Sequence, residues 1–524
     1  MLTALWNARW WPGRTGRRVL FIACLLFASS LAGVAQLQYL QESARLFEQN
    51  DLSGAESQAR LALTDLSTRA VAYSILGAIR FRQAKYEQSA GFLEKALRLN
   101  PHLIGAEINL GNVYVLEGRK SQASLAFNNA LKLDHNNFNA RFALARLEGE
   151  SGHYAASLEL ARPIDSQLRR TDEGLVLLAS DELGMKDERA AEGLIEDWLE
   201  LDNPAHPATL SMAGIYADHE LFKDAISILE HGENKGGDSF DIDFALGENY
   251  LRLDDLDEAK AEYNLALERR QGCAECLDRL GRIAEQEDHL DEALSDLLKA
   301  RRDAPADPEV LFEFGKLCVK KGLYLDSISS LSAALKLQPA NEKFQYVLAS
   351  AYTGTRQFKP AIAILRHLVI LHPKDPLLNY SLGSVQYLES DLSGAESHLQ
   401  LSIRLNPQQL GSYYYLGLIK DQQGNSDAAA QIFESLAKRN PDDPATLTAL
   451  GRILFAQRKL PEAQTVLERA VKLDPSSIKA HYQLGMVLGR LGQREASRRE
   501  FAAVKSLNAV ADKQTEMRIF SLDQ

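Results

Sequence analysis

Small residues recur along this chain at a fixed spacing of 34 positions from residue 36 onward. In a first series of fourteen positions, every residue is Gly, Ala or Ser. The series consists of Ser43, Gly77, Gly111, Ala145, Ala179, Ala213, Gly247, Gly281, Gly315, Ala349, Gly383, Gly417, Gly451 and Gly485. A second series lies twelve residues further along and holds only Ala or Ser, from Ala55 to Ser497. A self-match at one constant period indicates a repeat architecture.

Apolar residues accompany the small ones. The residue before each first-series position is apolar in thirteen of the fourteen repeats, and Glu42 is the exception. Pro closes seven repeats, at positions 101, 305, 339, 373, 407, 441 and 475, where it ends a helix. The pattern predicts two antiparallel helices per repeat, whose small residues let the axes approach while larger apolar residues fill the space beside them. Pro163 falls inside the second helix of the fourth repeat, so we expect that helix to be irregular.

The combination of Leu110, Gly111, Tyr114, Ala123, Phe127 and Ala130 in the third repeat resembles the tetratricopeptide repeat family. The resemblance covers about residues 36–511, as fourteen repeats without an insertion, and residues 512–524 then form the tail of a capping helix. It implies an all-α, right-handed solenoid whose first helices line a concave, protein-binding face. Val510, Met517, Ile519 and Phe520 are expected to cover the last repeat.

Aromatic residues recur at one position that should face this groove. If residue 36 is position 1 of the first repeat, position 5 is aromatic in five of the last six repeats, and position 12 adds two more aromatics. These seven residues are Phe312, Tyr346, Tyr380, Tyr387, Tyr414, Phe455 and Tyr482. We expect a continuous aromatic ladder that binds an extended or helical peptide. The alternative is that the rings pack between neighbouring helices and have a structural role.

Charges of both signs occupy the middle of the expected groove, at Asp241, Arg252, Glu275, Asp278, Arg279, Arg282, Glu309 and Lys316. They favour a polar, solvated stretch. The net charge of the chain is −12, and the first 35 residues contribute four Arg and no acid. The rest therefore has 55 basic and 71 acidic residues, a net charge of −16, which argues against nucleic-acid binding.

The N-terminus has the pattern of an export signal. A basic flank ending in Arg17 and Arg18 precedes seventeen uncharged residues, 19–35. Gly33 and Ala35 are small, which predicts cleavage between Ala35 and Gln36. An uncleaved membrane anchor is the alternative, with the basic flank in the cytoplasm. Either way we expect an exported chain, periplasmic or secreted, and in the second case anchored in the inner membrane.

Cys273 and Cys276 are separated by two residues, Ala274 and Glu275, at the junction of the seventh and eighth repeats. In an oxidising compartment they could form a disulfide. They could also be two incidental small residues, or serve metal or redox chemistry.

No phosphate-binding loop, metal motif or nucleophile elbow occurs in the sequence, so we expect no enzymatic activity, cofactor, metal or small-molecule substrate. The sequence favours a bacterial-type envelope scaffold that binds proteins or peptides. One alternative is a subunit of a secretion, envelope-assembly or polysaccharide-export complex. A repeat protein of the glycosyltransferase type is a distant alternative, because it would need a long segment outside the repeats.

Overall fold

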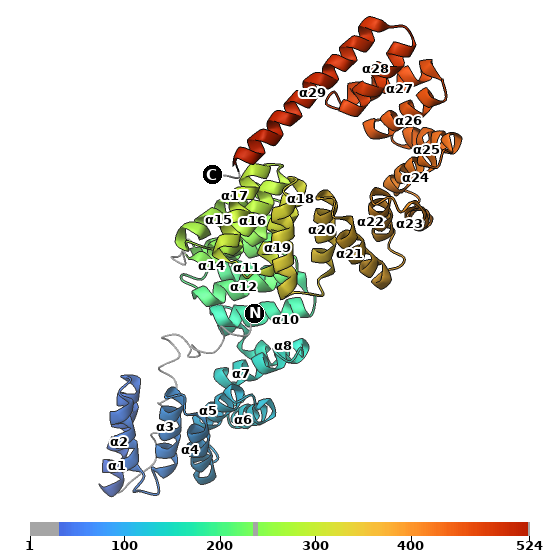
Figure 1. Ribbon diagram of the computed structural model, residues 1–524. Coiled ribbons are helices and arrows are strands. Elements are labelled where there is room, and N and C mark those ends of the chain that lie inside the picture. The colour runs from blue at the N-terminus through green and yellow to red at the C-terminus, as the bar shows by residue number, and fades with distance from the viewer. Residues whose placement is uncertain (1–30, 234–238, 522–524) are drawn as a thin grey trace. The chain divides into compact units, whose positions relative to one another are not determined.

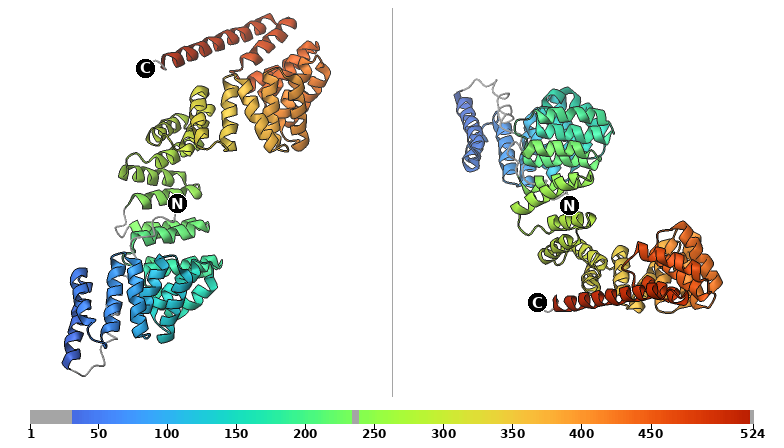
Figure 2. Two further views of the ribbon diagram at one scale, coloured as in Figure 1. Left: turned by 60° about the horizontal axis from the view of Figure 1, so that its bottom comes forward. Right: turned by 90° about the horizontal axis from the view of Figure 1, so that it is seen from above.

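The computed structural model describes residues 31–233 and 239–521, in which the regular structure is helical (Figure 1). The chain divides into two compact units, Met1–Arg270 and Gln271–Gln524. Each unit consists of helix pairs joined by short turns and stacked in chain order, as the two views of Figure 2 show. The predicted all-α solenoid of helix pairs is confirmed.

The helices of the first unit are α1 (Leu31–Glu48), α2 (Leu52–Ala62), α3 (Arg69–Arg82), α4 (Tyr86–Leu99), α5 (Ile104–Leu116), α6 (Lys120–Leu133), α7 (Phe138–Gly149), α8 (Tyr154–Ala161), α9 (Asp165–Leu168), α10 (Asp172–Gly184), α11 (Glu188–Leu199), α12 (His206–Asp218), α13 (Phe222–Gly232), α14 (Phe240–Arg252) and α15 (Leu256–Arg269). The helix expected to contain Pro163 is broken there: α8 ends at Ala161, a 3-10 turn spans Arg162–Ile164, and α9 follows. The predicted irregularity is confirmed, because Pro cannot donate the hydrogen bond that would continue α8.

The helices of the second unit are α16 (Ala274–Gln286), α17 (Leu290–Asp303), α18 (Pro308–Lys320), α19 (Tyr324–Leu337), α20 (Glu342–Gly354), α21 (Phe358–Leu371), α22 (Pro376–Leu388), α23 (Leu392–Leu405), α24 (Leu410–Gln422), α25 (Ser426–Arg439), α26 (Pro444–Ala456), α27 (Leu460–Leu473), α28 (Ile478–Arg490) and α29 (Arg494–Ser521). Several of the first helices begin with an Asp-Pro pair. Asp375 is one such cap, and its carboxylate accepts hydrogen bonds from the N–H groups of Leu377 and Leu378.

The glycines of the first small series have a specific packing role. A Cβ atom at Gly417 would lie 2.7 Å from the ring of Phe433, and one at Gly281 would lie 2.7 Å from Leu297. In both cases the opposing side chain is at position 24, on the second helix of the same pair. The large residue at position 24 therefore fills the space that the glycine leaves, and each pair closes tightly.

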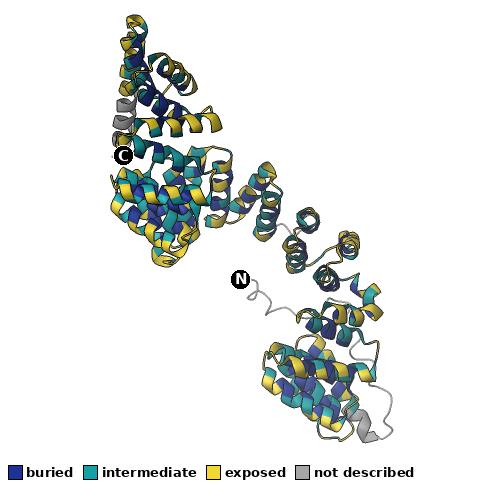
Figure 3. Cartoon of the chain, turned by 90° about the vertical axis from the view of Figure 1, so that its right-hand side faces the viewer, coloured by how far each residue is buried: buried dark blue, intermediate teal, exposed yellow. Residues whose placement is uncertain are grey.

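The second small series completes this contact. Ala395 and Ala463 are fully buried at position 20. At Ser89 and Ser497 the hydroxyl donates to the backbone carbonyl of the first-series residue, Gly77 at 2.7 Å and Gly485 at 2.8 Å, whereas the Ser157 hydroxyl donates to the Asp181 carboxylate. These three buried hydroxyls are thus paired, which removes most of the cost of burying them. Figure 3 shows the resulting cores, with buried residues between the helices of each unit.

The turn inside each pair has one backbone geometry throughout the chain. The residue at position 15 has a positive φ in all fourteen repeats, between 56° and 79°, although only five of these residues are Gly. The N–H of the following residue donates to the carbonyl five residues earlier, for example from Asn425 to Lys420 at 2.9 Å. This is the usual way to satisfy the last carbonyls of a helix before the chain reverses.

Residues 1–30 of the predicted signal or anchor lie outside the described residues. Helix α1 begins at Leu31, so it includes the expected Ala35–Gln36 cleavage point. No helix within residues 31–233 or 239–521 is both long enough and apolar enough to span a bilayer. Val510, Met517, Ile519 and Phe520 belong to α29, but their side chains lie outside the described part.

Candidate protein-binding surface

The first helices of the second unit carry the seven predicted aromatic residues. Six of the seven are half-buried, and Tyr482 is 47% exposed. The rings therefore both pack against neighbouring helices and keep part of their surface exposed. We call α20, α22, α24, α26 and α28 the tyrosine segment.

Tyr415 is the centre of the largest ring cluster. Its ring centroid lies 5.5 Å from that of Tyr387, 5.8 Å from that of Tyr414 and 6.1 Å from that of Tyr380. Tyr414 also contacts Phe433, edge to face, at 5.6 Å. Edge-to-face contacts of this kind stabilise a pair by about 0.5–1.5 kcal/mol beyond the apolar area that they bury. Tyr415, at position 6, lies one residue away from the predicted series, and the run of three tyrosines at 413–415 was its signal in the sequence.

Tyr380 also packs on the next repeat. Its ring lies over Gly411 in the first turn of α24, where a Cβ atom would come within 2.7 Å of it. Burial raises the pKa of Tyr380, Tyr414 and Tyr415, so all three hydroxyls stay protonated at neutral pH. The cluster offers apolar ring surface and neutral hydroxyl groups.

The other predicted rings stand apart from this cluster. Phe312 stacks on Phe344 at 4.6 Å, and Tyr346 shares a hydrogen bond with Ser381 at 3.1 Å. Tyr482 contacts Phe501 at 5.8 Å. Among the described residues, ring contacts are thus continuous from Tyr380 to Phe433 and do not form one ladder from Phe312 to Tyr482. Position 5 of α26 is Thr448, which separates Tyr414 from Tyr482.

An ion pair between Arg452 of α26 and Asp421 of α24 lies beside the tyrosine cluster. Burial raises the pKa of the Tyr387 hydroxyl. The positive charge of Arg452 opposes this increase, and the negative charge of Asp421 adds to it. Phe455 lies one helical turn beyond Arg452 and packs half-buried against the core of α25–α28.

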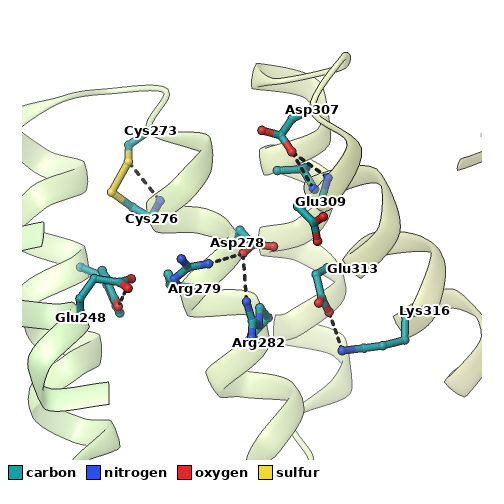
Figure 4. A network of polar contacts seen from close by, with 12 residues as sticks. Glu248, Cys273, Cys276, Asp278, Arg279, Arg282, Asp307, Glu309, Glu313 and Lys316 are labelled. Atoms are coloured by element: carbon teal, nitrogen blue, oxygen red, sulfur yellow. Dashed lines mark hydrogen bonds and ion pairs between the residues drawn. A yellow bond between two sulfur atoms is a disulfide. The ribbon is translucent and has the colours of Figure 1, made fainter. Parts of the chain in front are cut away.

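Charged side chains dominate α16 and α18, which we call the charged segment, and Figure 4 shows their contacts. Asp278 is only 4% exposed, so the expectation of a solvated stretch is wrong at this residue. Its carboxylate lies 2.9 Å from Arg279 and 3.8 Å from Arg282. Burial raises the pKa of Asp278 to about 6, and the two arginines offset this only in part.

A second set of charges in the charged segment pairs across two helices. Lys316 lies 2.5 Å from Glu313 on its own helix and 3.2 Å from Glu285 on α16. Burial opposes the charge on Lys316, but the two carboxylates raise its pKa overall. The charges of this segment are therefore largely paired with one another.

Cys273 and Cys276 are joined by a disulfide, with Cα atoms 5.3 Å apart, in the turn that precedes α16 (Figure 4). The N–H of Cys276 also donates to the sulfur of Cys273 at 3.1 Å, so Cys273 caps the helix. Both residues are buried. Within the described residues, no cluster of His, Cys, Asp and Glu could hold a metal ion.

Two stretches of the chain match profiles of known protein families. Residues 420–488 and residues 244–273 each match a profile described as a tetratricopeptide repeat. Both matches are to repeats that are typical of non-catalytic scaffolds, and no catalytic domain is identified. A comparison with curated proteins finds no match.

Several solved structures are similar to the chain at low identity. The Cut9–Hcn1 hetero-tetramer of the APC/C has 15% identity and a TM-score of 0.41, over 88% of this chain and 99% of that one. A tetratricopeptide repeat protein from Parabacteroides merdae has 16% identity and a TM-score of 0.37, over 47% and 97%. MamA from Desulfovibrio magneticus RS-1 has 22% identity and a TM-score of 0.30, over 32% and 93%.

These structural similarities are too distant to carry function from one protein to another. Both matched segments consist of helix pairs closed by small residues at positions 8 and 20. The chain contains tetratricopeptide repeats, matched at residues 244–273 and 420–488.

Proposed function

We propose that this chain is a non-enzymatic scaffold of the cell envelope that binds a protein or peptide along its tyrosine segment. The observation that carries the proposal is the cluster of Tyr380, Tyr387, Tyr414 and Tyr415, whose rings are held in place by packing and yet partly exposed. Rigid aromatic side chains lose little conformational entropy on binding, which is why tyrosine is enriched at protein interfaces.

The chemistry of this surface favours an uncharged or weakly charged ligand. The groove positions of α20 and α22 carry Ser350, Thr353 and Ser384 between the tyrosines, and these side chains are short and neutral. In contrast, the charged segment already pairs its own ions, so a ligand would have to break those pairs to bind there. We therefore assign binding to the tyrosine segment.

The experiment is a peptide-display screen with the full chain, followed by affinity measurement on the double variant Tyr387→Ala/Phe455→Ala. Selected peptides should lose roughly tenfold or more in affinity, since two aromatic contacts are removed. The matched control is Arg282→Ala/Lys320→Ala in the charged segment, whose side chains are 47% and 43% exposed. The proposal would be overturned if the selected peptides lost affinity for the control variant and kept their affinity for the aromatic variant.

Envelope location is supported by the sequence of residues 1–35, with its basic flank and uncharged stretch, and the Cys273–Cys276 disulfide is compatible with an oxidising compartment. Cell fractionation of the native chain, combined with N-terminal sequencing, tests this part separately. Recovery with periplasmic or membrane markers supports export, and a new N-terminus at Gln36 would show cleavage. Recovery only with cytoplasmic markers would refute export and leave the binding surface untouched.

A further inference from the structure

The last repeat of the second unit, formed by α28 and α29, exposes aromatic surface that the other repeats of that unit bury. Position 24 is at most 2% exposed in the six preceding repeats, at Leu297, Leu331, Leu365, Leu399, Phe433 and Leu467. In the last repeat the same position is Phe501, which is 36% exposed. Tyr482, which contacts it, is 47% exposed. We call Tyr482, Phe501, Arg498 and Lys505 the end face.

The rest of the molecule shows what normally covers such a face. Phe433 shares its core with Ala449, Leu450 and Ile453 of the next first helix, α26. These three residues stand at positions 6, 7 and 10 of their repeat. The same positions cover Phe127, where the next first helix, α7, contributes Ala143, Leu144 and Leu147. A helix with apolar residues at i, i+1 and i+4, of which the first is small, therefore fits the surface around position 24.

The first helix of the chain lacks this pattern. In α1, positions 6, 7 and 10 are Gln41, Glu42 and Arg45, and Arg45 pairs with Glu42. Glu42, the one exception to the apolar position in the sequence, is thus paired within α1. A second copy of this chain that docked its α1 on the end face would bury Gln41, Glu42 and Arg45 at the positions where α26 and α7 place apolar residues, and burying charged groups is costly. Head-to-tail stacking of two copies is therefore disfavoured.

Charge also limits which helix could pack on the end face. Position 21 of one repeat meets position 11 of the next: Glu56 lies 2.6 Å from Arg80, and Glu396 lies 2.5 Å from Lys420. In the last repeat, position 21 is Arg498, which is exposed. The residue that meets it, one position after the last apolar residue of the docked helix, should accordingly be acidic.

The surroundings of the end face have the same sign. Residues 478–511 contain six Lys and Arg against two Glu, a net charge of +4, in a chain whose net charge is −12. Lys505, one helical turn after Phe501 on α29, is exposed, and so is Arg490 near the end of α28. Such a local excess of positive charge attracts acidic partners and sets the orientation in which they dock.

We propose that the end face binds an acidic amphipathic helix of a partner protein, which stacks on the last repeat as a further first helix would. The docked helix carries apolar residues at i, i+1 and i+4 and a carboxylate at i+5, opposite Arg498. This site is separate from the tyrosine segment, so either could exist without the other.

The test uses fluorescence anisotropy with the full chain and labelled peptides derived from α26, residues 444–456. One probe carries Leu454→Glu, which places a carboxylate at position 11, and a second carries Leu454→Lys. A third replaces Ala449, Leu450 and Ile453 by the polar residues of α1. The acidic probe should bind at least tenfold more tightly than the lysine probe, and the polar probe should not bind.

Two variants of the chain make the result specific. Phe501→Ala should abolish binding of the acidic probe, and Arg498→Glu should reverse the preference in favour of the lysine probe. Arg494→Glu is the matched control, since it changes the same charge on an exposed residue near the start of α29 and should leave the preference intact. Circular dichroism spectra should remain unchanged in all three variants.

Equal binding of the acidic and lysine probes, or a preference that Arg498→Glu does not reverse, would overturn the proposal. Concentration-dependent self-association that Phe501→Ala removes, measured by analytical ultracentrifugation, would also overturn it, because the occupant would then be a second copy of the chain.

Discussion

The charged segment and the tyrosine segment of the second unit use the same helix pairs and place different chemistry at the same repeat position. Position 5 is Asp278 on α16 and Tyr380 on α22. Asp278 is buried between Arg279 and Arg282, whereas Tyr380 packs on Gly411 and retains free ring surface. The scaffold thus allows either residue, because the close approach of the two helices depends on the small residues at positions 8 and 20. A ring at position 5 adds a contact with position 24, as Tyr414 does with Phe433.

The difference has an energetic side. A buried ion pair is a weak source of stability, because the cost of removing charges from water offsets their attraction. Half-buried aromatic rings stabilise by the apolar area that they remove from water. We therefore expect the aromatic rings of the tyrosine segment to stabilise the fold and also to provide binding surface. We expect the buried charges of the charged segment to lower the free energy of unfolding, which the packing of the neighbouring helices must offset.

The largest expected effect comes from the feature that both segments share. Gly417→Val and Gly281→Val should each destabilise the second unit by about 3 kcal/mol, because the new side chain collides with Phe433 or Leu297. Chemical denaturation would measure this. Gly91→Ala in α4 is the control, since a Cβ atom there meets nothing within 4 Å and the substitution should be neutral or stabilising. Clearly unequal costs at the two valine sites would contradict the idea of a common scaffold.

A smaller effect should come from position 5 of the tyrosine segment. Tyr380→Ala should cost about 2 kcal/mol, less than a fully buried aromatic, because it leaves a gap over Gly411 and in the cluster around Tyr415. Tyr380→Phe keeps the ring and should cost well under about 1 kcal/mol. Hydrogen exchange in α22 and α24 would localise the loss. An unchanged denaturation midpoint in Tyr380→Ala would show that the ring does not support the fold.

The smallest effect should come from position 5 of the charged segment and should depend on pH. The folded-state pKa of Asp278, about 6, lies above its ordinary value of 3.8, so the folded chain binds the proton more tightly than the unfolded chain. Asp278 therefore favours the folded state less as pH rises from about 4 to about 6. Asp278→Asn cannot ionise, and it should raise stability at pH 7 by about 1–2 kcal/mol relative to wild type.

The measurement for Asp278 is the difference in denaturation midpoint between variant and wild type at pH 4 and at pH 7. The difference should be near zero at pH 4 and positive at pH 7. Glu309→Gln, an exposed carboxylate on α18, should show no such change. A loss of stability at pH 7 in Asp278→Asn would mean that its two arginine contacts outweigh the cost of burial.

Much of the fold followed from the sequence because its determinants are local and periodic. Gly417 and Ala429 are visible as small residues at a constant spacing, and Pro163 as a break, without knowledge of their partners. The tyrosine positions were also predictable, because position 5 faces one side of a helix. Their division into separate ring contacts was not, since it depends on rotamers and on Thr448 between Tyr414 and Tyr482.

The burial of Asp278 could not be predicted in the same way. Its neighbours Arg279 and Arg282 suggest an exposed ion pair, but burial depends on α18, which packs against it from 30 or more residues along the chain. The end face could not be predicted from the sequence either, because Phe501 has the same identity and register as aromatic residues that are buried at position 24. Only the absence of a following helix in the described structure distinguishes it.

The positive φ at position 15 has a consequence for how such a chain can diverge. Nine of the fourteen residues there are not glycine and include Lys186, Glu220, Asp288 and Arg356. Since an L-residue pays about 1 kcal/mol or more in this conformation, the turn must be imposed by the closure of the helix pair. Each repeat thus has one position whose charge can be changed without altering the backbone. Substitutions at position 15 can therefore change the surface charge of each turn while the helix pairs stay the same.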